Sequence, residues 1–279
     1  MRSRFCGEHC PASPQISVII PTFNSSRTLE TCFTSIRNQT CKNIEAIVVD
    51  AYSTDDTCKV AQRYGARLLR LAAERSPARN LGAKEASGHF VFFIDSDMEL
   101  TPNVIQEALK ACVQQGVDAV IVPEESVGEG FLAKCKELEK KMRWQEAYGE
   151  APRFFKKSVF EFLGGYDERL VIGEDFELAQ RVNSARLKVG RIKSIIRHHE
   201  GHLSLRKLTA KLYYYGKTLP TYARKRPLLS LKTSSPVRFL KNLSLLKQQP
   251  ACYAGLCSLK LVEYLAYLSG ALASLLSSE

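Results

Sequence analysis

Short apolar runs alternate with amphipathic segments along the first half of the chain. Five runs have the length of buried strands and are predicted to be strands at 16–20, 44–49, 66–71, 90–94 and 117–122. Capping residues and apolar spacing predict helices between them, at about 25–37, 53–64, 77–88 and 102–115. Strands alternating with helices of this length favour an α/β fold, with a mostly parallel sheet flanked by helices.

The pattern changes after Gly128. Helices of mixed polarity are predicted at 131–148 and 173–182, and long helices that carry Lys and Arg between Leu and Tyr begin at Leu203. The sequence therefore predicts an N-terminal tail (1–14), an α/β domain (15–202) and a basic, amphipathic helical region that associates with membranes (203–279).

The apolar segment 251–276 is interrupted by Lys260 and Glu263. Its uncharged part, 264–276, is shorter than the roughly 20 residues that span a bilayer. We therefore expect an interfacial or core helix rather than a spanning one, and whether it inserts into a bilayer stays open.

The charge of the chain is concentrated in one region. The net charge is +11, but the stretch from Arg186 to Pro250 alone holds 16 basic residues and one acid, Glu200. Such a block attracts an anionic membrane or nucleic acid, although a solvated surface that only aids solubility has the same composition. Tyrosines between the cations at 203–226 suit the headgroup layer of an anionic membrane.

The nine cysteines form no CxxC motif, and the first residues lack the apolar stretch of a secretory signal. Reduced thiols in the cytoplasm are the simplest interpretation. Cys6, His9 and Cys10 are a weak metal-site pattern because no second ligand pair accompanies them.

Polar residues follow three of the predicted strands, at Pro21–Asn24, Asp50–Tyr52 and Asp95–Asp97. Ligands of parallel sheets bind at this edge. In an extended segment, Asp95 and Asp97 would point to one spot and hold Mg²⁺ or Mn²⁺ together with substrate phosphates. The alternative for these aspartates is a turn or a helix cap.

Other candidates are weighed against structural roles. Asp50 can accept hydrogen bonds from a nucleotide base or form a turn, with Ser53 and Thr54 better placed to cap the next helix. The pair Arg79-Asn80 suits phosphate or carboxylate binding, or a plain surface and structural role. The pair Glu174-Asp175 supplies a general base or favours the helix dipole.

The segment from His198 to His202 fails the zinc-protease spacing HExxH by one residue, because position 203 is leucine. One of these histidines, His198, remains a candidate contact to the metal or a phosphate.

Six blocks in order resemble family-2 glycosyltransferases of the GT-A fold. They are Pro21-Thr22-Phe23-Asn24, the run from Val48 to Thr57, Ala78–Gly82, Asp95–Asp97, Gly164–Glu168 and Glu174-Asp175. The resemblance covers about residues 16–200. It implies transfer of a sugar, with inversion, from a nucleotide-diphosphate sugar.

The resemblance also implies roles for residues at matching positions. Thr22 and Asp50 would contact the base and ribose, and Asp95 and Asp97 would hold Mn²⁺ or Mg²⁺ against the diphosphate. Asp175, with Glu174 beside it, would be the base on the acceptor hydroxyl. The remaining nucleotide-sugar-binding candidates are Pro21, Asn24, Arg79 on the pyrophosphate side, Asn80, and Gly164 and Gly165, which would let backbone approach the sugar.

One departure is that Ala51 and Tyr52 replace the family's second Asp and its Gly. A UDP-sugar is favoured as donor, and a GDP-sugar stays open. The expected acceptor is a lipid, a lipid-linked glycan or a polysaccharide at the cytosolic face of a membrane, where the protein is peripheral, and nucleic acid is an unlikely partner. Two alternatives are an inactive module that docks on membrane or RNA through its basic tail, and a nucleotidyltransferase, whose glycine-rich loop after the first strand is missing.

Overall fold

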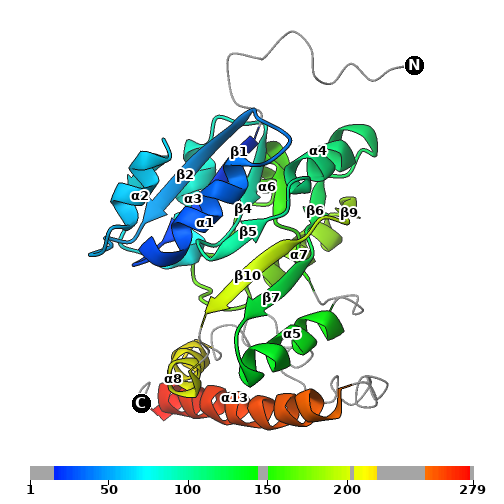
Figure 1. Cartoon of the computed structure of the whole chain (residues 1–279). Helices are drawn as coiled ribbons and strands as arrows, with labels where there is room; N and C mark the ends of the chain where they lie inside the picture. Colours follow the sequence, from blue (N-terminus) through cyan, green and yellow to red (C-terminus); the bar gives the residue numbers. More distant parts are fainter. Residues whose placement is uncertain (1–15, 144–149, 202–203, 219–248, 277–279) are drawn as a thin grey trace.

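The computed structural model describes residues 16–143, 150–201, 204–218 and 249–276. Its centre is a seven-stranded sheet with the order β3-β2-β1-β4-β8-β6-β9, in which only β8 runs antiparallel to its neighbours (Figure 1). The strands are β1 (Ile16–Thr22), β2 (Ile44–Asp50), β3 (Arg67–Arg70), β4 (Phe90–Phe93), β6 (Ala119–Ile121), β8 (Phe154–Lys156) and β9 (Val189–Arg191). The expectation of a mostly parallel α/β sheet is confirmed.

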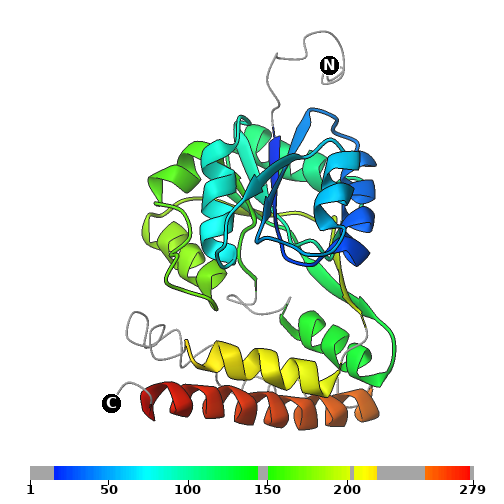
Figure 2. The same cartoon turned by 90° about the vertical axis from the view of Figure 1, so that its left-hand side faces the viewer.

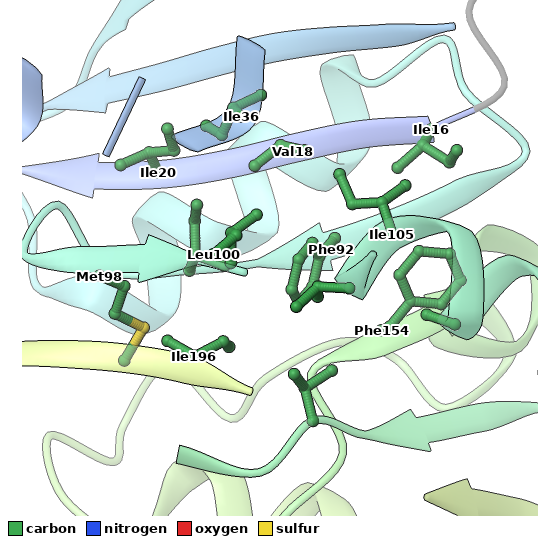
Figure 3. Close-up of a cluster of buried hydrophobic side chains, with 14 of the residues drawn as sticks. Ile16, Val18, Ile20, Ile36, Phe92, Met98, Leu100, Ile105, Phe154 and Ile196 are labelled. Atoms are coloured by element: carbon green, nitrogen blue, oxygen red, sulfur yellow. The ribbon is translucent and has the colours of Figure 1, made fainter. Parts of the chain in front are cut away.

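Helices cover both faces of this sheet because β1 is apolar on both. Ile16, Val18 and Ile20 pack on one side, with residues of α1, α2 and α4, as Figure 3 shows for the strand residues. Ile19 packs on the other side with residues of α3, α6 and α7. The helices are α1 (Ser26–Arg37), α2 (Thr57–Arg63), α3 (Arg75–Glu85), α4 (Val104–Gln114), α6 (Lys157–Phe162) and α7 (Glu174–Ser184).

All five predicted strands are present, but a second, three-stranded sheet was not predicted. It has the order β5-β10-β7, from Met98–Leu100, Ile196–Gly201 and Glu124–Gly128. β5 has only three residues, β7 and β10 are largely polar, and their partners lie far away in the sequence. No long apolar run therefore marked them.

Ser53 and Thr54 do not cap α2, because Ser53 donates its N–H to the Asp50 carboxylate at 2.9 Å and α2 begins only at Thr57. Asp55 caps α2 instead by accepting the N–H of Thr57 at 3.0 Å. It also accepts the N–H of Ser26, the first residue of α1, at 3.1 Å. The cap of one helix is thus supplied by the loop before the next.

Three further helices lie below the sheet domain in the views of Figures 1 and 2: α5 (Phe131–Arg143), α8 (Leu205–Gly216) and α13 (Pro250–Leu276). Cys135, Leu138 and Met142 of α5 pack against Tyr253, Leu256 and Leu259 of α13 in a separate hydrophobic cluster. The α5 helix, which lies inside the predicted domain 15–202, therefore packs with the C-terminal helices. The domain boundary at 202 stays a prediction.

The α13 helix is continuous through Lys260 and Glu263, and by length and composition alone it could cross a membrane. The seven described cysteines are free. The predicted cysteine–histidine pattern at 6–10, residues 144–148 of the predicted helix and residues 219–248 of the basic block lie outside the described residues.

Candidate functional site

A cavity of about 540 Å³ opens at the carboxyl ends of β1, β2 and β4. This is the edge where parallel sheets bind ligands, and the volume is that of a small-molecule site. The structure places five of the predicted site residues on its wall: Pro21, Thr22, Asp95, Asp97 and His198.

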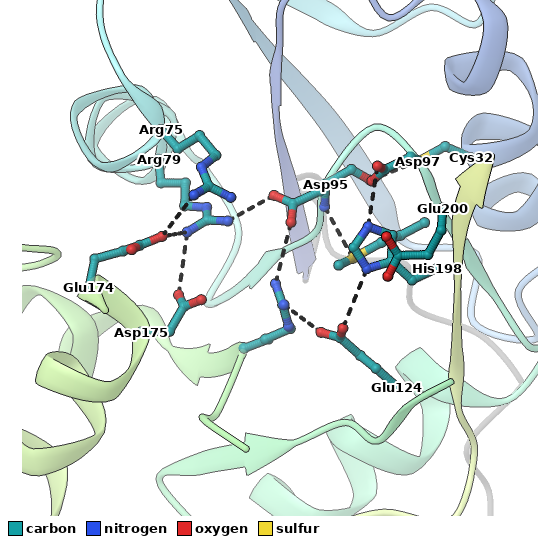
Figure 4. A network of polar contacts seen from close by, with 12 residues as sticks. Cys32, Arg75, Arg79, Asp95, Asp97, Glu124, Glu174, Asp175, His198 and Glu200 are labelled. Atoms are coloured by element: carbon teal, nitrogen blue, oxygen red, sulfur yellow. Dashed lines mark hydrogen bonds and ion pairs between the residues drawn. The ribbon is translucent and has the colours of Figure 1, made fainter. Parts of the chain in front are cut away.

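Asp95 and Asp97 both line the cavity, but the extended segment expected between them is absent and their carboxylates have different partners. Asp95 accepts a hydrogen bond from Arg79 Nη2 at 2.8 Å, whereas Asp97 Oδ2 lies 3.2 Å from His198 Nε2 (Figure 4). The segment is a turn rather than an extended strand, because the N–H of Met98 bonds to the carbonyl of Asp95 at 3.1 Å. Alternation along a strand does not hold across such a turn.

The surroundings of Asp95 and His198 set their charge states. Burial would raise the pKa of Asp95, but the guanidinium groups of Arg79 and Arg153 outweigh burial and hold this pKa well below its usual range. Burial would lower the pKa of His198, but its contacts with Asp97 and Glu124 raise it to about 10. A network of alternating charges therefore runs from Arg79 to His198.

The donor set near Asp97 fits a divalent cation in part. Asp97 Oδ1 is a buried oxygen that has no hydrogen-bond partner in the structure, and the imidazole of His198 lies beside the same carboxylate. Carboxylate oxygen suits Mn²⁺, and so does the imidazole nitrogen of His198 once it has released the proton that Asp97 and Glu124 stabilise. No group of three or more His, Cys, Asp or Glu within the described residues is arranged to hold a metal. The residues therefore fit a metal whose coordination is completed by substrate oxygens, as is common for Mg²⁺.

Arg79 of α3 organises the other end of the network. Its side chain is 1% exposed, and it contacts three carboxylates: Asp95, Glu174 at 3.1 Å and Asp175 at 3.3 Å. The ring of Tyr166 packs against the guanidinium, 5.3 Å from its centroid. Arg79 does not line the cavity. Its position therefore does not support the expected direct contact with a pyrophosphate.

Arg75, one helical turn earlier, lines the cavity instead. It lies at the start of α3 and was not predicted as a site residue. Its Nη2 lies 3.2 Å from the hydroxyl of Tyr215 and 3.9 Å from Glu174 Oε1. A cation on the wall at this point is the group that can meet a phosphate.

Glu174 and Asp175 begin α7 after Gly173, which has a left-handed φ of 76°. Glu174 is buried, and burial together with the charge of Asp175 raises its pKa against the opposing effect of Arg79 and Arg75. The side chain of Asp175 is 24% exposed and therefore the more accessible of the two. Figure 4 shows both carboxylates directed at Arg79.

Asp50 and Asn24 are not among the residues that line the cavity. Asp50 is fully buried and accepts hydrogen bonds from the Thr22 hydroxyl at 2.9 Å and from Ser53. Burial would raise the pKa of Asp50, but these hydrogen bonds lower it. The side chain of Asn24 accepts the N–H of Thr54 at 2.9 Å, which ties the loop after β1 to the loop after β2. Both residues position Thr22 and its loop.

Tyr52, at the position where the family pattern has glycine, adopts a left-handed φ of 58°. Glycine takes that conformation without steric cost, and tyrosine does not. Its ring is half exposed, with the Arg70 guanidinium 5.8 Å from the centroid. The departure from the family pattern therefore changes a surface turn next to the cavity.

Asn80, Gly164 and Gly165 also lie away from the wall. Asn80 bonds to both backbone groups of Tyr166, accepting its N–H at 2.8 Å and donating to its carbonyl at 2.9 Å. A Cβ on Gly165 would lie 2.6 Å from Asn80 Oδ1, and both glycines have positive φ. Their structural role is to hold Tyr166 under Arg79, and the predicted sugar contact stays a prediction.

Two further members of the network were missed. Arg153, just before β8, forms an ion pair with Glu124 and lies 4.0 Å from Asp95, and Glu124, the first residue of β7, lies 3.8 Å from His198. Arg153 precedes a short strand and Glu124 begins one, and neither belongs to a motif. The only feature of the sequence that could have indicated them is that each is a charged residue next to the end of a strand.

The α8 helix supplies the last part of the wall. Lys211 and Tyr215 line the cavity, and Lys211 Nζ lies 5.7 Å from the centre of the Tyr215 ring. Tyr214 donates its hydroxyl to Glu74 at 2.5 Å, next to Arg75 at the start of α3. The basic, aromatic segment predicted for a membrane therefore also completes the cavity.

Comparison with known proteins gives a consistent family. Residues 17–160 match the model described as "Glycosyl transferase family 2". A relative from Campylobacter jejuni, the GalNAc(5)-diNAcBac-PP-undecaprenol beta-1,3-glucosyltransferase, is 30% identical over 248 residues, which are 75% of this chain and 80% of that protein. The Staphylococcus aureus poly(ribitol-phosphate) beta-N-acetylglucosaminyltransferase TarP is 28% identical over 167 residues, 53% of this chain and 50% of that protein.

Solved structures share the fold at low identity. The mannosyltransferase PcManGT from Pyrobaculum calidifontis, in complex with GDP-Man and Mn²⁺, superposes with a TM-score of 0.63 at 18% identity, over 96% of this chain and 88% of that one. Residues 1–349 of Staphylococcus aureus TarS in complex with UDP give a TM-score of 0.55 at 17% identity, over 95% and 92%. The sheet and its flanking helices are thus those of the GT-A fold.

Proposed function

Because this chain belongs to glycosyl transferase family 2, we propose that its cavity moves a sugar, with inversion, from a nucleotide-diphosphate sugar to a hydroxyl of a membrane-proximal acceptor. The observation that carries the proposal is the cavity at the strand ends, with Asp97 and His198 on its wall and cationic Arg75 and Lys211 beside them. Cations and a metal-binding carboxylate together are what a diphosphate requires.

The nucleotide lies at the ends of β1 and β2 in this proposal. Thr22 and Pro21 contact the base and ribose, and Asp50 acts from below by fixing the Thr22 hydroxyl. The solved relatives bind UDP and GDP-Man, so the fold accepts both nucleotides. A UDP-sugar is our preferred donor, and a GDP-sugar is the alternative.

Asp97 and His198 would hold Mn²⁺ or Mg²⁺, with Asp95 behind them. The metal would neutralise charge on the departing diphosphate. The related PcManGT structure contains Mn²⁺, which supports this choice. Arg75 and Lys211, both on the cavity wall, bind the same phosphates and stabilise the leaving group without a metal bond.

Asp175 is the general base. Inversion needs a base on the side of the sugar opposite the diphosphate, and Figure 4 shows Asp175 and His198 on opposite sides of Asp95. The guanidinium of Arg79 forms ion pairs with Asp175, Glu174 and Asp95. Arg79 therefore positions both the general base and Asp95, which lies beside the metal-binding residues. Asp175 takes the proton of the acceptor hydroxyl as that oxygen attacks the sugar.

The acceptor is a lipid, a lipid-linked glycan or a polysaccharide. A lipid-linked acceptor is favoured because the Campylobacter relative is named for a glycan on undecaprenyl diphosphate. The exposed cations Arg206, Lys207 and Lys211 of α8 suit an anionic cytosolic membrane surface, and nucleic acid is not expected to bind.

Thermal unfolding of the chain with UDP, GDP, CDP and dTDP, each with and without Mn²⁺, tests the nucleotide site. A ligand at 100 times its Kd adds about 2.7 kcal/mol to the free energy of unfolding. We expect stabilisation by UDP or GDP that depends on Mn²⁺ and is lost in Asp97→Asn, with the exposed Glu161→Gln as matched control.

Release of nucleoside diphosphate from a panel of donors then tests the transfer. Metal-dependent release supports the proposal. No stabilisation by any nucleotide and no release with any donor would favour the inactive, membrane-docking alternative.

A further inference from the structure

The exposed surface of α13 has an unusual composition. Its large exposed side chains are all apolar or aromatic: Leu261, Val262, Tyr264, Leu265, Leu272, Leu275 and Leu276. No exposed position of this 27-residue helix holds a charged residue. Helices on the surface of a soluble protein ordinarily place their charged residues outward.

The two charged residues of α13 lie on its inner side. Lys260 pairs with Glu139 of α5 at 2.7 Å, and Glu263 pairs with Lys136 of α5 at 2.8 Å. Glu139 and Glu263 are buried. The helix is therefore inverted, with charges inside and leucines outside, as in elements that face hydrocarbon and satisfy their polar groups within the protein.

The outward face of α13 is also the outer edge of the molecule. Figures 1 and 2 show α13 along the lower edge, with α5 and α8 between it and the sheet domain. The α8 helix packs closely on α13, because a Cβ on Gly270 would lie 2.0 Å from the carbonyl oxygen of Tyr213. The two helices therefore form one packed unit, whose apolar outer face belongs to α13.

We propose that this face of α13 docks on a lipid bilayer, with the helix lying in the plane of the interface. The neighbouring α8 carries Arg206 and Lys207 at exposed positions and no acidic residue, which matches anionic headgroups. The expected lipid is therefore an anionic one.

An in-plane orientation follows from the packing. If α13 crossed the bilayer, the contact between Gly216 and Gly270 would draw α8 and its exposed cations into the hydrocarbon. The exposed charged residues of α5, Lys134 and Lys141 among them, would follow through the shared cluster. Lying flat, the same unit keeps these charges at the headgroups.

The docking face connects directly to the cavity. The α8 helix packs on α13 and also carries Lys211 and Tyr215, which line the cavity. On the proposed function, which this step assumes, a lipid-linked acceptor held in the docked bilayer reaches the cavity from the α8 side.

Flotation of the full chain with lipid vesicles tests the docking face. Vesicles of phosphatidylcholine alone and of phosphatidylcholine with phosphatidylglycerol are compared for the wild type and for the double variant Leu265→Glu/Leu272→Glu. The matched control is Val113→Glu/Phe162→Glu, which puts the same charges on exposed apolar residues of α4 and α6.

We expect the wild type and the control to float with anionic vesicles and the α13 variant to lose roughly tenfold or more of its vesicle affinity. Absence of flotation of the wild type, or equal loss in the control, would overturn the proposal. So would a wild-type dimer that the α13 variant dissociates without any vesicle binding, because a second copy would then occupy the face.

The nucleotide thermal shift, measured on the same variants, separates the two proposals. An α13 variant that binds Mn²⁺ and nucleotide normally but no longer floats supports the docking face and leaves the proposed function intact. A wild type that floats but binds no nucleotide supports docking alone and contradicts the proposed function.

Discussion

Two buried charge clusters in this molecule differ in composition and in setting. In the Arg79 cluster, one guanidinium contacts three carboxylates, those of Asp95, Glu174 and Asp175. In the Lys136 cluster, Lys136 and Lys260 of neighbouring helices meet Glu139 and Glu263. The first lies against the cavity and the second between α5 and α13.

The difference separates a structural charge network from a functional one. Among the described residues, the Lys136 cluster joins two cations to two anions at a helix contact, so apolar residues of similar size could replace it. The Arg79 cluster includes the further cations Arg75 and Arg153 and lies beside the cavity wall that holds Asp97, whose Oδ1 has no hydrogen-bond partner among the described residues. An unpartnered carboxylate oxygen beside a cavity is expected where substrate or metal supplies the missing charge.

Replacing Arg79 should have the largest effect. Arg79→Met leaves three neighbouring carboxylates without their common cation, and removal of one partner from a buried ion pair costs about 3–5 kcal/mol of the free energy of unfolding. Urea denaturation measures this cost. The exposed Arg63→Met is the control, and a loss no larger than that of the control would contradict the role given to Arg79.

The same variant predicts a pH dependence. The pKa of Asp95 lies below its usual range in the native protein, so its stabilisation is complete above the unfolded-state pKa of about 3.9 and is lost as the pH falls through the native pKa. Without Arg79, the pKa of Asp95 moves up toward its usual range, so acidification removes less stability from the variant than from the wild type. The difference in unfolding free energy between wild type and variant should therefore shrink as the pH falls below about 4. A constant difference would argue against the ion pair.

Asp175→Asn should affect turnover much more than binding. Loss of a general base lowers kcat by about 10²–10⁴-fold, while nucleotide affinity should stay close to that of the wild type. Release of nucleoside diphosphate measures turnover, with Glu161→Gln as control. Wild-type kcat in Asp175→Asn would exclude this residue as the base.

Lys260→Leu and Lys260→Leu/Glu263→Leu test the balanced cluster. The single change leaves excess negative charge between α5 and α13 and should cost about 2–3 kcal/mol, whereas the double change should recover most of this loss. Urea denaturation of both variants checks the recovery. Equal destabilisation in the two variants would show that charge balance does not govern this cluster.

Gly270→Ala should disturb the packing of α8 on α13. The added Cβ would lie 2.0 Å from the carbonyl of Tyr213, and forcing atoms into a packed contact costs about 1–3 kcal/mol. Thermal unfolding measures this cost against Ser269→Ala, an exposed neighbour. An unchanged Tm would mean that α8 and α13 do not approach as closely as described.

The local pattern of apolar residues was enough to predict the strands of the sheet and some of the residues of the site. The apolar runs of β1, β2 and β4 are continuous, so both their burial and the residues that follow them could be placed on one edge. Thr22, Asp95 and Asp97 follow or end these strands, so their place at this edge could be predicted, and they line the cavity. Arg153, Glu124 and Arg75 could not be placed, because their contacts join segments far apart in the sequence.

The sequence by itself determined the α/β architecture, the six ordered blocks and the edge where the site lies, since strand periodicity and strand ends are local properties. Only the tertiary structure decided that a turn separates Asp95 from Asp97, and that Arg79 bonds to carboxylates rather than facing the cavity. It also decided that Lys260 and Glu263 face inward. The direction in which a charged side chain points depends on which opposite charge the fold brings near it. The distance between two such residues in space cannot be read from their separation in the sequence.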